Sequence, residues 1–219
     1  MRPITEHWPK AVLPIGGRAV LAVLLRQLAA AELETVWLVT GHLAEQVERL
    51  AGDGSTFGLA VRFVRQPQVL GSADAVRRAL AAGAEPPLVA VAADTLFHGG
   101  DIARFAREFA SSGAAGAVAV RTDPPPAPNR RAVRRVGSRI EQISDEDPAN
   151  PWSGAPLWGV GNAVAERLSL DRPPHELANA FQAAIDAAAT VIAVEIGKTR
   201  DLTDPLDLVK ENFPYLRSI

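Results

Sequence analysis

The sequence predicts an α/β fold in which helices cover both faces of a mostly parallel, Rossmann-like sheet. Two observations lead to this prediction. Short apolar runs of strand length alternate along the chain with longer segments of helical periodicity, which is the β-α-β-α order of parallel sheets. One run, residues 87–93, is continuously apolar up to Asp94, and such continuity is typical of a parallel strand buried on both faces.

The first half of the chain repeats this alternation. Residues 34–40 form an apolar run that Gly41 stops, and residues 59–66 alternate apolar and polar side chains, as a half-buried strand does. A further strand is expected over 114–121. Helices are predicted between and around these strands, over 19–31, 42–50, 71–82 and 101–110.

The second half is less regular. We expect a proline-rich loop over 123–130, strands within 133–143 around a turn at Gly137-Ser138, and another loop over 145–154. Later strands are expected at 155–160 and 190–196, and later helices at 162–170, 175–188 and 205–212. The chain is therefore predicted to be a single domain, residues 1–219, with a small lobe over the sheet at about 123–160.

The composition excludes several classes of protein. The net charge of −2 gives no general attraction to nucleic acid or to a membrane surface, and no run reaches the roughly 18 apolar residues of a membrane span. Cysteine is absent, which excludes disulfides, thiolate metal sites and a thiol nucleophile. We expect a cytoplasmic protein that binds neither nucleic acid nor membrane, and a homo-oligomer stays open.

Three polar positions follow predicted strands and are expected to meet. Ligands of open α/β sheets bind outside the carboxyl ends of the strands. Gln66, Asp94 and the loop after Ile196 each follow a strand. They should therefore converge on one cleft.

Two aspartates in this cleft are candidate magnesium ligands. A carboxylate at the tip of a buried strand suits Mg²⁺, which prefers hard oxygen donors and phosphate partners. Asp94 has this position, and a turn cap through Thr95 is the alternative. Helix capping explains Asp204 and Asp207 but leaves Asp201 unexplained, so Asp201 is the second candidate.

Lys10 is a candidate phosphate-binding residue. It lies between Pro9 and Pro14, in front of an apolar run, where its ammonium can be directed at a triphosphate that gains charge during transfer. The alternative is an exposed surface lysine near a frayed terminus.

Gln66, Gly71 and Ser72 are candidate nucleotide-binding residues. The amide of Gln66 offers a donor and an acceptor that can read a base edge, and glycine lets the backbone approach a ligand closely. Turn geometry alone would also explain Gly71, and capping of the following helix would explain Ser72.

These motifs, in their order and spacing, resemble the sugar-1-phosphate nucleotidylyltransferases, the group that holds glucose-1-phosphate thymidylyltransferase and mannose-1-phosphate guanylyltransferase. The resemblance rests on R-P-I-T and P-K within 2–10, G-D-G-S-T-F-G-L at 52–59, Q-P-Q-V-L-G-S-A-D-A-V at 66–76 and D-L-T-D-P-L-D-L at 201–208. It implies a fold of the nucleotide-diphospho-sugar transferase type. It also implies transfer of a nucleoside monophosphate from an NTP to a sugar 1-phosphate, with Mg²⁺ and release of pyrophosphate.

The resemblance also implies roles for single residues. It assigns the phosphates to Lys10, the base to Gln66 and Gly71, the metal to Asp94 and Asp201, and the sugar to Glu146. Ser72 lies in the same nucleotide-binding motif as Gly71.

The sequence departs from the family at two places. The family begins with a buried central strand and a G-x-G-T-R loop that cradles the triphosphate, and Met1 stands just where this segment should end. We therefore expect the first strand and glycine-rich loop to be missing, with unpaired backbone groups on the neighbouring strands and poor turnover. The family's Glu-Lys-Pro motif reads Glu146-Asp147-Pro148 here. The alternative function is that of a catalytically impaired relative that binds or senses a sugar nucleotide.

Overall fold

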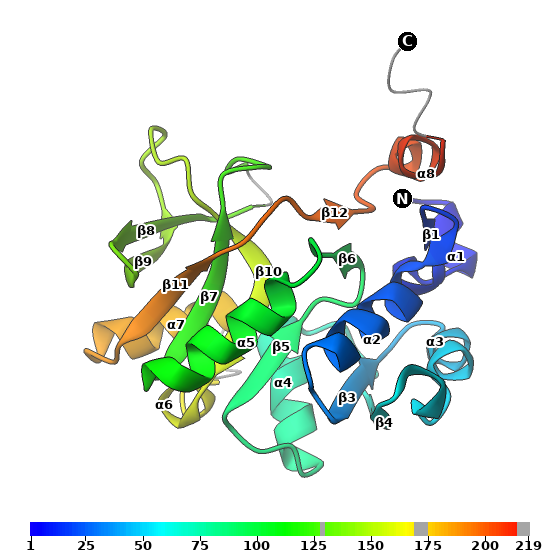
Figure 1. The fold of residues 1–219 in the computed structure, drawn as a ribbon, viewed down its shortest axis with the longest axis horizontal. Helices are drawn as coiled ribbons and strands as arrows, with labels where there is room; N and C mark the ends of the chain where they lie inside the picture. Colours follow the sequence, from blue (N-terminus) through cyan, green and yellow to red (C-terminus); the bar gives the residue numbers. More distant parts are fainter. Residues whose placement is uncertain (128–129, 169–174, 214–219) are drawn as a thin grey trace.

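The computed structural model describes residues 1–127, 130–168 and 175–213, and it has an α/β fold (Figure 1). The main sheet has six strands in the order β5-β10-β7-β11-β9-β8. Their bounds are β5 Leu88–Val91, β7 Gly116–Arg121, β8 Ala132–Val136, β9 Arg139–Asp145, β10 Ser153–Val160 and β11 Val191–Glu195. Smaller sheets pair β3 (Thr35–Thr40) with β4 (Ala60–Arg65), β1 (Pro14–Ile15) with β2 (Arg18–Ala19), and β6 (Thr95–Leu96) with β12 (Arg200–Asp201).

The strands of the main sheet are mixed in direction, where we predicted a mostly parallel sheet. β5, β7 and β11 run the same way, but β10 lies antiparallel between β5 and β7, and β9 lies antiparallel beside β11. β8 and β9 form an antiparallel hairpin around Gly137-Ser138, at the predicted turn. The antiparallel strands come from the irregular half of the chain, where short turns and loops replace the crossover helices that parallel pairing needs.

Helices cover both faces of this sheet, as predicted. In Figure 1, α2 (Val20–Ala30) and α5 (Asp101–Ser112) lie in front, while α6 (Asn162–Ala165) and α7 (Leu177–Asp186) lie behind. Successive side chains of β7 pack on opposite faces of the sheet, since side chains alternate along a strand. Ala117 belongs to the core that contains Phe105 of α5, and Val118 to the core that contains Phe181 of α7.

The remaining helices lie at the two ends of the chain and beside the β3–β4 sheet. They are α1 (Ile4–His7), α3 (Ala44–Ala51), α4 (Ser72–Ala81) and α8 (Pro205–Asn212), with short 3-10 turns at Lys10–Val12 and Ser55–Phe57. No helix in the described ranges has the length and apolarity needed to cross a membrane.

The predicted elements are recovered with two notable differences. The helix expected over 162–170 is the short α6, and residues 169–170 lie outside the described residues, as do residues 128–129 of the predicted proline-rich loop. The segment 123–160, expected as a small lobe, supplies β8, β9 and β10 to the main sheet itself. Its loops are then the part that lies over the cleft described below.

β5 is half-buried, which corrects the prediction of a strand buried on both faces. All four of its residues are partly exposed, whereas all six residues of β7 are buried. β5 pairs with β10 on one side only, and β3 pairs only with β4, so each strand has one edge that no strand in the described ranges covers. β5 is therefore apolar like a central strand but lies at an edge.

Candidate functional site

A large cleft of about 2360 Å³ is lined by both of these uncovered strands. Residues 35–39 and 88–91 contribute the β3 and β5 walls. The other apolar walls are one face of α2 (Leu21, Leu24, Leu25, Leu28) and one face of α4 (Ala75, Val76, Ala79). Charged side chains line the cleft where β5 and β7 end, and they include Lys10, Asp94, Arg121, Arg130, Arg131, Glu146, Asp147 and Asp201.

Lys10 and Asp94 lie together at this charged end. Lys10 is fixed in a 3-10 turn that begins after Pro9, and its Nζ is 3.8 Å from Oδ2 of Asp94. Each side chain is 37% exposed. An exposed pair of this kind stabilises a fold by about 1 kcal/mol at most, so the pair matters chiefly for where it places the two charges.

Asp201 is brought beside Asp94 by the pairing of two very short strands. β12 lies antiparallel to β6, with Asp201 opposite Thr95 and Arg200 opposite Leu96. Because Thr95 directly follows Asp94, the two candidate metal ligands enter the cleft from neighbouring strands. Leu202, which is 1% exposed, packs with Leu96 and anchors the β12 segment.

Two carboxylates from paired neighbouring segments are the kind of donor set that a magnesium site completed by substrate would use. Mg²⁺ is commonly held by one or two carboxylates together with phosphate oxygens and water, because it gives up its hydration reluctantly. Within the described residues, no group of three or more His, Cys, Asp or Glu side chains gathers in a way that could hold a metal ion alone. Asp94 and Asp201 would therefore hold Mg²⁺ only together with a bound phosphate.

Gln66 and Gly71 have internal partners in this structure and are not among the residues that line the cleft. The Gln66 amide donates to the Gly71 carbonyl at 3.0 Å and to Oδ2 of Asp74 at 2.9 Å. Gly71 has a φ of +108°, and a Cβ there would meet the His175 carbonyl oxygen at 2.4 Å. Their proposed contact with a base stays a prediction.

Ser72 lines the cleft but does not cap its own helix, which corrects the capping alternative. α4 begins at Ser72, with Gly71 as its N-cap and no side-chain cap. The Ser72 hydroxyl instead accepts from the Leu177 amide at 2.8 Å and donates to Glu176 at the start of α7. Ser72 thus joins α4 to α7.

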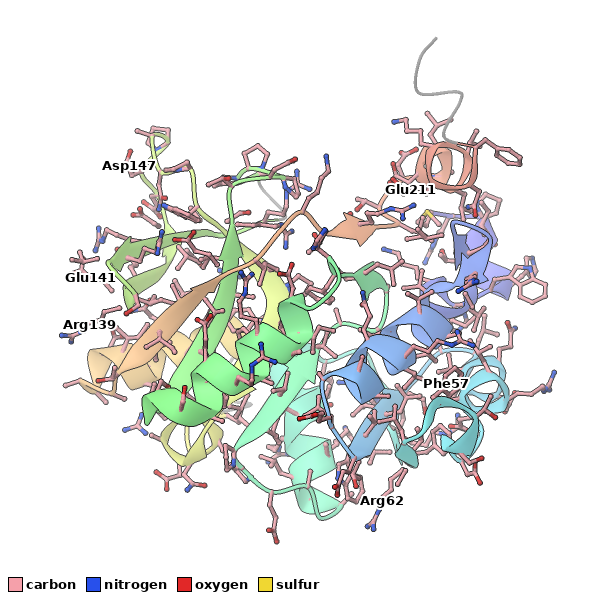
Figure 2. All side chains as sticks on the ribbon, in the orientation of Figure 1. Phe57, Arg62, Arg139, Glu141, Asp147 and Glu211 are labelled. Carbon is pink, nitrogen blue, oxygen red and sulfur yellow. The ribbon has the colours of Figure 1, made fainter. Side chains whose placement is uncertain are left out.

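Glu146 and Asp147 lie on the exposed loop that follows β9. Both line the cleft, and Figure 2 shows Asp147 on this loop, far from Arg62 and Phe57 at the β3–β4 side of the molecule. The carboxylate of Asp147 therefore adds negative charge where the resembled family has a lysine.

Arg121 is a candidate site residue that the sequence reasoning missed. It ends β7, is only 2% exposed and lines the cleft. Burial lowers the pKa of its guanidinium, and the negative charge of Asp201 raises it in part. The signal was present in the sequence, because a charged residue ends an apolar run at Arg121 just as it does at Asp94.

The architecture defines the fold class of the chain, the α/β nucleotide-diphospho-sugar transferase fold. Solved structures show the same fold: a UDP-glucose pyrophosphorylase complexed with UDP-glucose superposes with a TM-score of 0.83 at 17% identity, covering 100% of this chain and 94% of that one. A UTP-bound UGPase from Acinetobacter baumannii gives 0.73 at 20% identity, covering 98% and 88%.

Within this class, the chain belongs to the family of the MobA-like NTP transferase domain, whose model matches residues 4–158. Two similar curated proteins are glucose-1-phosphate thymidylyltransferases. That of Streptomyces antibioticus is 27% identical over 100% of this chain, and that of Streptomyces griseus is 29% identical over 95%. The chain spans 64% and 61% of the lengths of these two relatives.

Proposed function

We propose that the protein transfers a nucleoside monophosphate from an NTP to a sugar 1-phosphate, with Mg²⁺ and release of pyrophosphate. The observation that carries the proposal is the meeting of Lys10, Asp94 and Asp201 at one end of the cleft. These residues come from three distant parts of the chain. The family membership and the names of the relatives support the same reaction.

The proposed reaction is a single displacement at phosphorus. An oxygen of the sugar phosphate attacks the α-phosphorus of the NTP, a new P–O bond forms, and the bond to the oxygen that bridges to the β-phosphorus breaks. Pyrophosphate leaves with that electron pair. No side chain forms a covalent intermediate, so the protein acts by positioning and by stabilising charge.

The residues of this chain divide these tasks. Lys10 supplies a positive charge to the phosphates as their charge shifts toward the leaving group. Asp94 and Asp201 would hold Mg²⁺, which when bound would neutralise phosphate oxygens. Until substrate binds, the ion pair with Asp94 keeps the Lys10 ammonium at the charged end of the cleft.

The second candidate function is binding of a sugar nucleotide without turnover. Two observations favour it: the open edges of β3 and β5, and the acid at Asp147. A continuous sheet would hold both sides of the site rigidly, whereas here the β3–β4 sheet and the main sheet share no strand pairing in the described residues. On this reading nucleotide binds and pyrophosphate is not released.

Pyrophosphate release, measured with an NTP panel, Mg²⁺ and glucose 1-phosphate or mannose 1-phosphate, separates the two functions. We expect release that requires a sugar 1-phosphate, and a loss of about 10²–10³-fold in kcat/KM in Lys10→Met, because one charge that stabilises the transition state is removed. Lys210→Met, at an exposed position of α8 that is not among the residues lining the cleft, is the matched control and should act as wild type.

The other outcomes are equally clear. Calorimetry that shows tight nucleotide binding without any pyrophosphate release would establish the non-catalytic binder. Neither binding nor release with any of the NTPs would refute both candidate functions.

A further inference from the structure

Arg121 is a buried cation with unpaired hydrogen-bond donors. It is 2% exposed, and its Nε and Nη1 atoms are buried without a hydrogen-bond partner in residues 1–127, 130–168 and 175–213. Each buried donor left unpaired costs about 1–3 kcal/mol, and a buried charge costs more unless it is paired. An arginine that only filled space could be replaced by an apolar residue at a gain in stability.

Other buried arginine nitrogens in the described residues have an evident explanation. Arg135 also has an unpaired Nε, but its guanidinium stacks on Trp152 at 3.9 Å and pairs with Glu195 at 2.5 Å. Among the residues that the structure describes, no ring stacks on Arg121 and no acid pairs with it as Trp152 and Glu195 do with Arg135. The acids that influence it, Asp201 and Asp123, act on it by charge and are not in ion-pair distance in the structure as described.

The surroundings of Arg121 favour an anion from outside the protein. Arg121, Arg130 and Arg131 line the same side of the cleft, and the charge of Arg130 acts against the charged form of Arg121. The side chain of Arg130 donates to the Pro125 carbonyl at 3.1 Å. The side chain of Arg131 donates to the Ser144 hydroxyl at 2.6 Å. A bound anion would relieve the repulsion and would satisfy the unpaired donors of Arg121.

We propose that Arg121 binds the phosphate of the acceptor substrate. A planar guanidinium binds phosphate oxygens through more than one N–H group, which a lysine ammonium does not do in the same fixed geometry. The anion site stands on the buried guanidinium, whereas its assignment to a sugar 1-phosphate rests on the proposed function.

The position of Arg121 distinguishes this phosphate from the triphosphate. Arg121 ends β7, Asp94 follows β5, and only β10 lies between these strands, so the two strands are about 10 Å apart across the sheet. Asp201 lies opposite Thr95 in the β6–β12 pair, and its charge also acts on Arg121. Two phosphates held from Lys10 and from Arg121 would thus flank one carboxylate pair, as a displacement between two phosphate groups requires.

The test uses inorganic phosphate as the probe, with neither NTP nor Mg²⁺ present. Thermal unfolding and calorimetry are measured for wild type, Arg121→Met, Arg121→Lys and the control Arg49→Met, an exposed arginine of α3. We expect phosphate to raise the wild-type Tm beyond sodium chloride of equal ionic strength. Arg121→Met should lose at least about 10-fold in phosphate affinity while its Tm without phosphate is unchanged or higher.

Other results of the same measurements would overturn the proposed phosphate site at Arg121. Phosphate affinity that is unchanged in Arg121→Met, or a wild-type Tm that responds to phosphate only as it does to chloride, would overturn it. If Arg121→Met does not fold, Arg121→Lys decides: a reduced affinity at an unchanged Tm supports the site, and an unchanged affinity overturns it.

A further variant keeps this test separate from the proposed function. Lys10→Met should retain the phosphate response. If Lys10→Met loses this response while Arg121→Met retains it, the phosphate binds at Lys10 and the Arg121 site is refuted. If wild type binds phosphate through Arg121 but releases no pyrophosphate and binds no NTP, the anion site stands and the proposed function fails.

Discussion

Asp74 is the buried carboxylate that ties the Gln66 segment to α4. It is 1% exposed and accepts hydrogen bonds from Gln66 at 2.9 Å and from Arg78 at 2.7 Å. Burial acts to raise the pKa of Asp74. The opposing effect is larger and comes from the hydrogen bonds of Arg78 and Gln66 and the charges of Arg78 and Arg77, so the net pKa lies below the ordinary 3.8. Asp74 therefore fixes the side chain of Gln66, a candidate site residue.

The direction of this pKa fixes how stability depends on pH. A carboxylate with a lowered folded-state pKa stabilises the fold above its unfolded pKa, and that stabilisation is lost as pH falls below about 4. Asp74→Asn should lower the free energy of unfolding by about 1.5–3 kcal/mol at pH 7, because a charged acceptor is removed. Urea unfolding across a series of pH values from 7 downward checks this, and a loss that does not shrink as the pH falls through the lowered folded-state pKa would argue against the ionised form.

At the residue scale, Asp94 and Asp201 were predictable because strand order implies a cleft where their strands end, and Lys10 because prolines flank it in front of an apolar run. The sequence could not predict what packs on Gly71, since the segment at His175 that contacts Gly71 lies more than 100 residues away in the chain. Arg121 was predictable by the reasoning applied to Asp94, because both are charged residues at the end of an apolar run.

At the scale of elements, the uncovered edges of β3 and β5 are the feature with most consequence. Both strands and the apolar faces of α2 and α4 line one cleft, so its four walls match the surroundings of a buried strand. Met1 packs near Leu96 and Leu202 at the charged end of this cleft. We propose that a strand joined to Met1 would complete the sheet and carry a phosphate-binding loop to Lys10.

This proposal predicts a gain in stability on extension. An apolar strand with a glycine-rich loop fused ahead of Met1 should raise the Tm by at least about 5 °C, because it would pair backbone groups and bury apolar surface. A fused segment of the same length with its apolar residues changed to serine and lysine is the control. An equal Tm for both fusions would count against a strand site between β3 and β5.

The element order was predictable from hydrophobic periodicity, but strand pairing was not. β10 enters the sheet between β5 and β7 through contacts that no local pattern records. β6 and β12 are two residues long, too short to have any periodicity, although their pairing brings Asp201 to Asp94.

At the scale of the whole molecule, the fold places two charged groups around one cleft. Lys10, Asp94 and Asp201 lie on the β5 side, and Arg121 with its neighbouring arginines lies on the β7 side. The family and the fold agree with an NTP transferase, and the proposed chemistry needs both sides: one for the triphosphate with Mg²⁺, and one for the acceptor phosphate.

We propose that Lys10, Asp94 and Asp201 together form one metal-assisted phosphate site, and nucleotide binding depends on it most directly. Calorimetry of dTTP, UTP, GTP and CTP, each with and without Mg²⁺, tests it on wild type, Asp94→Asn, Asp201→Asn and the exposed control Asp186→Asn. We predict that Mg²⁺ tightens binding of at least one NTP by about 10-fold or more, that either site variant abolishes this gain, and that the control keeps it. Equal wild-type affinity with and without Mg²⁺, or a gain that both site variants retain, would contradict a metal-assisted site at Asp94 and Asp201.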